Sequence, residues 1–193
     1  IQTGIVPKDW KTAKVVPIFK SGARGKPSNQ RPVSLTSTVS KLQEGIIREK
    51  VMDHLNNNNL LKASQHGFME NRSCQTNLLE FIDKISEMLD EGKPVDVVYL
   101  DFSKAFDKIS HAKLLKKLEA HGICGRVKNW IKNWLIGRTQ FVSVNGSSSD
   151  VKNVTSSVPQ GSVLGPPLFI VYNNDMDDIA TLIDILKKFD SKV

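Results

Sequence analysis

The sequence predicts an α+β fold, with helices and strands mixed along the chain and no βαβ repeat. In several segments apolar residues recur at helical spacing, and in others short apolar runs are bounded by turn residues, which is typical of strands. The chain has 193 residues, of which 39% are hydrophobic. This length and composition suit one domain, or two closely joined subdomains, around an apolar core.

The first part of the chain predicts a strand, a loop and a helix in that order. Residues 10–20 are an apolar run with lysines at its ends, which indicates a short strand. Residues 21–30 combine Gly, Pro, Ser and Asn with cations, which favours a flexible basic loop. Apolar residues at helical spacing then predict a helix over about 36–56, with Ser34 or Thr36 as its N-cap.

Two further segments complete the elements before the middle of the chain. Residues 78–89 predict an amphipathic helix that ends at 91–94, where Gly and Pro interrupt the pattern. Residues 95–102 are almost continuously apolar, which predicts a strand at the centre of its sheet. Asp101 stands at the end of this strand, where a carboxylate is a natural ligand for a hard cation such as Mg²⁺. An ion pair at the strand end is the alternative interpretation of Asp101.

The second half of the chain predicts two helices, a hairpin and a loop. Ser110 is a candidate N-cap for a helix that closes at 121–122, and residues 127–135 form the next helix. Asn145-Gly146 is a strong turn signal between strands at 141–144 and 151–157. Residues 159–162 are a loop before an apolar helix in which Pro166 occupies the first turn. The tail, 179–193, is expected to be a helix or a strand.

The net charge indicates what kind of partner the chain binds, and the cysteines indicate the cellular compartment. The formal net charge is +7, which favours a polyanionic partner, nucleic acid before membrane. Cys74 and Cys124 form no CxxC pair, which fits a reducing compartment without a zinc site, so we expect an intracellular protein of the nucleus or cytoplasm. No secretory signal is visible, and no apolar run approaches the ~20 residues that span a bilayer. The chain begins at Ile1, so we expect a piece of a longer protein.

Several side chains have the chemistry that nucleotidyl transfer requires. Lys20 and Arg31 flank the Gly-containing loop and are candidates for a triphosphate contact, Arg31 through its planar guanidinium. Phe106 could lie against a sugar, although a core position is the simpler interpretation. Gln160 and Gly161 offer an amide donor and a close approach of the backbone. The four histidines are expected to be structural or on the surface: His54, His66, His111 and His121. Trp130 and Trp134 are expected to pack in the core, with a base-stacking platform as the alternative.

Taken in order, five segments resemble the reverse transcriptase domain of non-LTR retrotransposons, the LINE-like and jockey-like class. They are 10–22 (WKTAKVVPIFKSG), 31–35 (RPVSL), 64–68 (SQHGF), 98–107 (VYLDFSKAFD) and 158–166 (VPQGSVLGP). The resemblance implies a right-hand polymerase fold of helical fingers and an antiparallel palm sheet. Residues 1–94 would be the fingers-like part and 95–193 the palm-like part.

The resemblance also implies RNA-templated DNA synthesis with two Mg²⁺ ions, an RNA template, a DNA primer and deoxynucleoside triphosphates. Asp101 is similar to the first metal carboxylate and Phe102 to the ligand that binds metal through its backbone carbonyl. Phe106 resembles the residue that gates the sugar. The implied nucleotide contacts are Lys20, Arg31, Gln160 and Gly161.

The end of the sequence departs from that pattern. The family's next motif has an aromatic residue, a small residue and two consecutive Asp, whereas residues 188–193 read KFDSKV, with Asp190 as the only acid. The second hairpin strand and the thumb are expected to be absent. We therefore expect a reverse-transcriptase-type domain that is catalytically inactive. A non-catalytic nucleic-acid-binding remnant and a degraded element copy are the alternatives.

Overall fold

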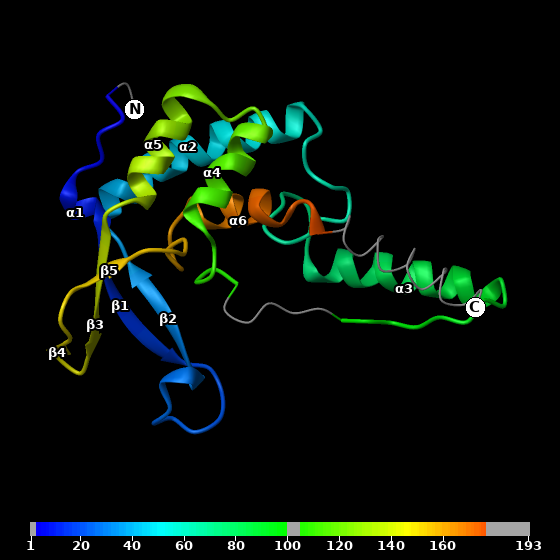
Figure 1. Ribbon diagram of the computed structural model, residues 1–193. Coiled ribbons are helices and arrows are strands. Elements are labelled where there is room, and N and C mark those ends of the chain that lie inside the picture. Colours follow the sequence, from blue (N-terminus) through cyan, green and yellow to red (C-terminus); the bar gives the residue numbers. More distant parts are fainter. Residues whose placement is uncertain (1–2, 100–104, 177–193) are drawn as a thin grey trace, which may run out of the picture. The chain divides into compact units, whose positions relative to one another are not determined.

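The structure is a computed structural model that describes residues 3–99 and 105–176, drawn as a ribbon in Figure 1. It forms two compact units. The sheet unit combines residues 3–60 with 105–172, and the α3 unit combines 61–99 with 173–176. Helices and strands are mixed along the chain, so the predicted α+β class is confirmed. The division into fingers-like and palm-like parts stays a prediction.

The sheet unit contains a mixed sheet. Its strands run in the order β2-β1-β3-β4, with β5 also paired to β3. Strand β1 is antiparallel to β2 but parallel to β3, whereas we expected an antiparallel sheet. Parallel pairing needs a long connection, and here the chain between β1 and β3 supplies one through several helices. The strands are β1 (Thr12–Phe19), β2 (Gln30–Leu35), β3 (Arg138–Val144), β4 (Ser147–Ser148) and β5 (Lys152–Val154).

The α-helices of the sheet unit gather at one end of the sheet (Figure 1). They are α1 (Lys8–Lys11), α2 (Thr38–Asn57), α4 (His111–Ala120), α5 (Gly125–Leu135) and α6 (Gly165–Asn173). The 3₁₀ turn η1 (Pro27–Asn29) lies in the loop between β1 and β2. The core side chains include Leu55, Leu114, Ile131, Trp134 and Leu168, each fully buried. Trp130 is also buried, so the prediction of a structural role for the two tryptophans is confirmed.

Helix caps follow the sequence in one case and depart from it in another. Ser110 caps α4 as predicted, because its Oγ accepts a hydrogen bond from the backbone N–H of Lys113. The cap of α2 was predicted wrongly. Ser37 accepts the N–H of Ser40, and Ser34 lies in β2. Ser34 lies opposite Val15 in the register of β2 with β1, so it belongs to the strand that precedes the helix.

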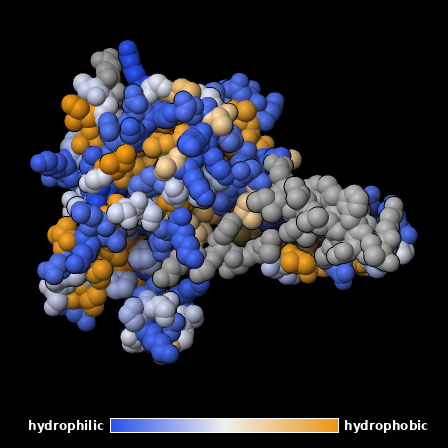
Figure 2. All heavy atoms as spheres, in the orientation of Figure 1, coloured by the Kyte–Doolittle hydropathy of each residue, from blue (hydrophilic) through white to orange (hydrophobic). Residues whose placement is uncertain are grey.

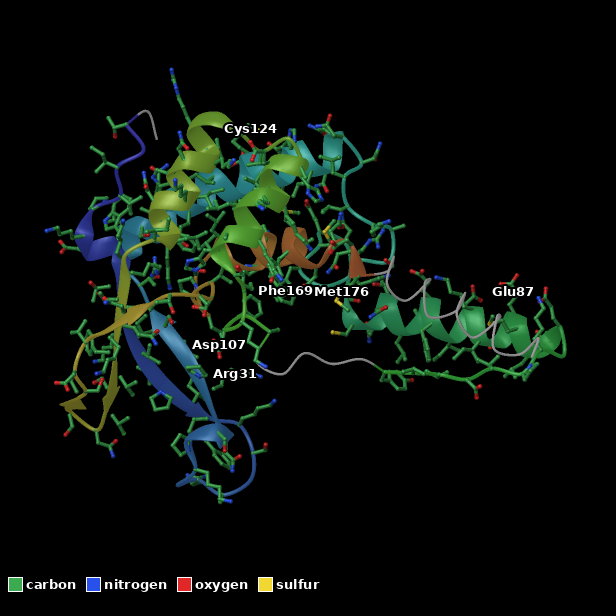
Figure 3. All side chains as sticks on the ribbon, in the orientation of Figure 1. Arg31, Glu87, Asp107, Cys124, Phe169 and Met176 are labelled. Atoms are coloured by element: carbon green, nitrogen blue, oxygen red, sulfur yellow. The ribbon has the colours of Figure 1, made fainter. Side chains whose placement is uncertain are left out.

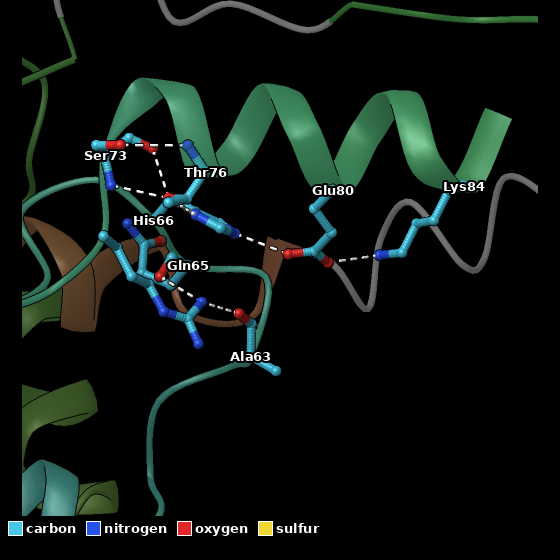
Figure 4. A network of polar contacts seen from close by, with 8 residues as sticks. Ala63, Gln65, His66, Ser73, Thr76, Glu80 and Lys84 are labelled. Atoms are coloured by element: carbon cyan, nitrogen blue, oxygen red, sulfur yellow. Dashed lines mark hydrogen bonds and ion pairs between the residues drawn. The ribbon is translucent and has the colours of Figure 1, made fainter. Parts of the chain in front are cut away.

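The α3 unit is organised around α3 (Cys74–Asp90) and a polar network at its start (Figure 4). Ser73 and Thr76 form a reciprocal capping box at the N-terminus of α3. The His66 ring contacts Thr76 Oγ1 at 2.9 Å and Glu80 Oε2 at 2.8 Å. Lys84 donates to the other oxygen of Glu80 at 2.7 Å. His66 therefore links the loop before α3 to the helix, which confirms its predicted structural role.

The strand predicted over 95–102 is not formed in its described part. Residues 95–99 belong to no strand, and Val98 and Tyr99 are 68% and 81% exposed. Tyr99 instead packs its ring 6.0 Å from that of Phe81 on α3. An extended segment becomes a strand only by pairing, and no strand of the described ranges pairs with it. A run of apolar residues predicts an extended backbone, but it does not identify the strand with which that backbone would pair.

The visible surface is mostly hydrophilic, with apolar patches between the blue residues (Figure 2). Of the helices in the part of the chain that the structure describes, none is long and apolar enough to cross a membrane.

Candidate functional site

The hairpin of β1 and β2 carries the predicted cations at its loop end. The backbone N–H of Lys20 donates to Asn29 O at 2.9 Å and closes the loop, while Arg31 follows at the start of β2 opposite Ile18. Gln30 Nε2 donates to Arg24 O at 2.7 Å, so hydrogen bonds hold the loop that the sequence predicted as flexible. Both Lys20 and Arg31 are exposed, which leaves their charged ends accessible to an anion.

The loop containing Gln160 and Gly161 lies directly on β2. The backbone N–H of Ser34 donates to Gln160 O at 2.8 Å. Gly161 has a φ of +107°, and a Cβ there would lie 2.9 Å from the backbone oxygen of Ser34. This close approach requires glycine. As a result, the loop is fixed three residues along β2 from Arg31.

Phe106 and Asp107 lie beside the start of the same loop. Val158 donates its backbone N–H to Phe106 O at 3.1 Å, and Ser156 Oγ donates to Asp107 O at 3.1 Å. The Phe106 ring stacks on Phe169 of α6, with 4.7 Å between centroids and 21° between planes. Figure 3 labels Arg31, Asp107 and Phe169 in their elements. The turn at 105–108 is thereby joined to the segment that leads to Gln160.

A cavity of about 280 Å³ opens between the sheet and this loop. Ser34, Asp107 and Gln160 line it together, with Arg138 from β3. The rest of the lining is half polar and half apolar. The polar residues are Thr139, Gln140, Asn153, Thr155, Ser156 and Ser157, and the apolar ones are Ala13, Val15, Pro32, Val154, Val158 and Pro159. Hydroxyl and amide groups of this kind can donate to or accept from a polar ligand.

The structure brings some predicted site residues together and leaves others undescribed. Gln160 lines the cavity, Gly161 follows it in the docked loop, and Phe106 is hydrogen-bonded to the segment before them. Asp101, Phe102 and Asp190 lie outside the described residues. Among the residues that the structure does describe, no group of three or more His, Cys, Asp or Glu side chains could hold a metal ion.

Two buried charges behind this loop were not predicted as site residues. Glu44 on α2 is 0% exposed, and its Oε2 accepts the backbone N–H of Val163 at 2.9 Å. Its position carried a readable signal, because residue 44 falls on the same helical stripe as the buried Ile47, Val51 and Leu55. An acid on an apolar stripe must find partners inside the protein.

Arg138, the first residue of β3, is the second buried charge. It is 1% exposed, and its guanidinium lies 5.0 Å from the centre of the Trp134 ring. Nη1 donates to Trp134 O at 3.3 Å, whereas Nη2 has no hydrogen-bond partner among the described residues. Burial lowers the pKa of Arg138 to about 10, and the nearby charge of Glu44 opposes that shift. Arg138 therefore remains a cation at neutral pH.

Comparison with known proteins gives a family match over most of the chain. The family described as reverse transcriptase (RNA-dependent DNA polymerase) matches residues 18–186. The probable RNA-directed DNA polymerase from transposon BS of Drosophila melanogaster is 31% identical over 177 residues, covering 88% of this chain and 19% of that protein. The RNA-directed DNA polymerase from mobile element jockey of the same species is 30% identical, covering 91% of this chain and 19% of its own length.

A third relative comes from another species. The retrovirus-related Pol polyprotein from type-1 retrotransposable element R2 of Popillia japonica is 30% identical over 167 residues, covering 86% of this chain and 23% of its own. The chain thus spans about a fifth of the length of these curated relatives.

Proposed function

This chain belongs to the reverse transcriptase (RNA-dependent DNA polymerase) family of mobile elements, and on that premise we propose that it binds template–primer and an incoming deoxynucleoside triphosphate. The observation that carries the proposal is the hydrogen bond from Ser34 N to Gln160 O. It places the strand that contains Arg31 against the loop that contains Gln160 and Gly161. Pro32 and Ser34 of that strand and Gln160 of that loop line one cavity, and Arg31 and Gly161 are their neighbours in the sequence. Nucleotide binding requires cations and a positioning surface close together.

Each named side chain has a part in this proposal. Lys20 and Arg31 neutralise the triphosphate, with Arg31 suited to a bidentate contact. Phe106, held by its stack on Phe169, lies against the sugar. Gln160 contacts the nucleotide, and Gly161 lets the template–primer approach the backbone. We assign residues 1–94 to a fingers-like part and 95–193 to a palm-like part of a right-hand polymerase.

We propose that the chain has lost the catalysis of nucleotidyl transfer. Asp101 and the backbone carbonyl of Phe102 would hold Mg²⁺, which when bound neutralises charge on the transferring phosphoryl group. The family pattern places two consecutive acids in its next motif, whereas the matching segment at 188–193 has Asp190 as its one acid. Removing groups that act together on a transition state costs several powers of ten in rate. We therefore propose that nucleotide and nucleic-acid binding persist without measurable synthesis.

A primer-extension assay tests this proposal. A poly(A) template with an oligo(dT) primer is supplied with dTTP and either Mg²⁺ or Mn²⁺. We expect the chain to bind template–primer and dTTP without extending the primer. Extension above background that disappears in Asp101→Ala would overturn the inactivity, and failure to bind dTTP in the presence of template–primer would overturn the nucleotide site.

A second candidate function is a non-catalytic nucleic-acid-binding module, acting within the nucleus or cytoplasm. The net charge of +7 and the exposed cations at 20–31 favour it. Binding to an RNA–DNA hybrid should then weaken steeply as salt rises, because bound phosphates release counterions. No detectable binding of the hybrid at low salt would rule this candidate out.

A further inference from the structure

Glu44 is a fully buried carboxylate whose hydrogen bonds reach three parts of the sheet unit. Its Oε1 accepts from Ser40 Oγ at 2.8 Å and from Trp134 Nε1 at 3.1 Å. Its Oε2 accepts the backbone N–H groups of Val163 at 2.9 Å and Leu164 at 3.4 Å. A buried charge is tolerated only when it is well hydrogen-bonded, and these donors supply that requirement.

The loop at 160–164 is therefore fixed at both ends. At one end Gln160 O accepts the N–H of Ser34 on β2, and at the other end Glu44 on α2 accepts from Val163 and Leu164. Ser34 and Glu44 lie in neighbouring elements of the chain, so β2 and α2 together clamp one loop. Gly161 lies between the two attachments.

The start of α6 explains why a carboxylate suits this position. Helix α6 begins at Gly165, and the N–H groups at its beginning have no partners within the helix. Ser162 Oγ accepts the N–H of Gly165 at 3.0 Å, and Glu44 accepts those of the two residues before it. Negative charge is also favourable at a helix N-terminus. An amide at residue 44 would have only one oxygen, and its NH₂ group would face one of the two pairs of donors that the carboxylate accepts from.

We propose that Glu44 is a positioning residue that holds the loop at 160–164 so that Gln160 faces the nucleotide and Gly161 faces the template–primer. The inference rests on the proposed function, since it concerns the same site. Glu44 does not touch the nucleotide, and it acts through the backbone of Val163 and Leu164. The carboxylate thereby determines nucleotide affinity from inside the core.

The test uses Glu44→Gln in the full chain, with Glu49→Gln as the matched control. Glu49 lies on the same helix, and its side chain is 67% exposed. Amide hydrogen exchange is followed at Val163 and Leu164, and the Kd for dTTP is measured with template–primer bound. We expect exchange at these amides to accelerate and the Kd for dTTP to rise roughly ten- to a hundredfold, the effect of losing hydrogen bonds to a charged group.

A double variant shows whether the effect passes through the loop. Once Gln160→Ala has removed the amide contact, Glu44→Gln should raise the Kd for dTTP less than it does alone. If Glu44→Gln does not fold, Glu44→Asp carries the test, since it keeps the charge but is one methylene too short to serve both sets of donors. We expect it to raise the Kd for dTTP and to accelerate the same amides.

The outcomes separate this inference from the proposed function. A wild-type chain that binds no dTTP would overturn both. If wild type binds dTTP and a folded Glu44 variant binds it with the same Kd, the positioning role alone would be overturned. Equal effects of Glu44→Gln and Glu49→Gln on exchange and on Kd would overturn it as well.

Discussion

A Cβ atom at Gly161 would lie 2.9 Å from the backbone oxygen of Ser34, closer than real side chains come to a backbone atom. The φ of +107° at Gly161 is a second reason why only glycine fits. The loop and β2 are held together by the adjacent hydrogen bond from Ser34 N to Gln160 O. A single methyl group would therefore push apart the two elements that form the cavity.

Gly161→Ala should destabilise the chain by about 1–3 kcal/mol, the typical cost of a strained backbone conformation. Urea unfolding followed by circular dichroism measures the change. Gly25→Ala is the matched control, because a Cβ at Gly25 meets nothing within 4 Å and its φ is not positive. A Gly161→Ala chain as stable as the control would contradict the close approach.

Trp134→Phe should cost more stability than Trp130→Phe. Both rings are buried and both substitutions remove similar volume, but only Trp134 Nε1 is seen to donate to Glu44, at 3.1 Å. Its loss leaves a buried carboxylate short of a donor, which costs about 1–3 kcal/mol beyond the cavity term. The free energies of unfolding of the two variants decide the comparison, and equal values would mean that the Glu44 bond contributes little.

Glu80 should make the stability of the α3 unit depend on pH. Hydrogen bonds from Lys84 and then His66 lower the pKa of Glu80 to about 2, below its ordinary value of 4.5. The folded state favours the ionised carboxylate, so this contribution is present above about pH 4.5 and is lost as the pH falls toward 2. Glu80→Gln should therefore destabilise the helix at neutral pH, and its difference from wild type should shrink on acidification.

Glu87→Gln on the same helix is the control for Glu80, since Glu87 is exposed (Figure 3 labels it). Helicity measured by circular dichroism across an acid titration shows both effects. A constant gap between Glu80→Gln and wild type from pH 7 to 2 would contradict the role given to the ion pair.

Arg31→Ala should weaken binding of dTTP in the presence of template–primer by roughly tenfold, within the range for a hydrogen bond to a charged group. Arg31→Lys should lie between that variant and wild type, because it keeps the charge but loses the planar fork. Arg48→Ala on α2 removes the same charge from another exposed site and is the control. Equal losses for Arg31→Ala and Arg48→Ala would show that net charge alone governs binding.

Local patterns predicted the helices well because capping and amphipathic spacing are contained within a short stretch of sequence. Ser110 caps α4 as the sequence predicted, and Pro166 lies in the first turn of α6. The predicted caps of α2 were wrong because a third hydroxyl nearby, that of Ser37, caps the helix, and Ser34 lies within β2. The segment at 95–99 failed for a related reason, since a strand needs a partner that lies elsewhere in the chain.

By itself the sequence determined the family and the order of its motifs, because those depend on which residues follow one another. Only the tertiary structure decided that Ser34 donates a hydrogen bond to Gln160, that β1 lies parallel to β3, and that Glu44 accepts hydrogen bonds from the loop before α6. These contacts join residues more than a hundred positions apart, and they form because buried polar groups must find partners once the core closes. Glu44 shows the difference most clearly: its place on an apolar stripe could be read from the sequence, but its partners could not.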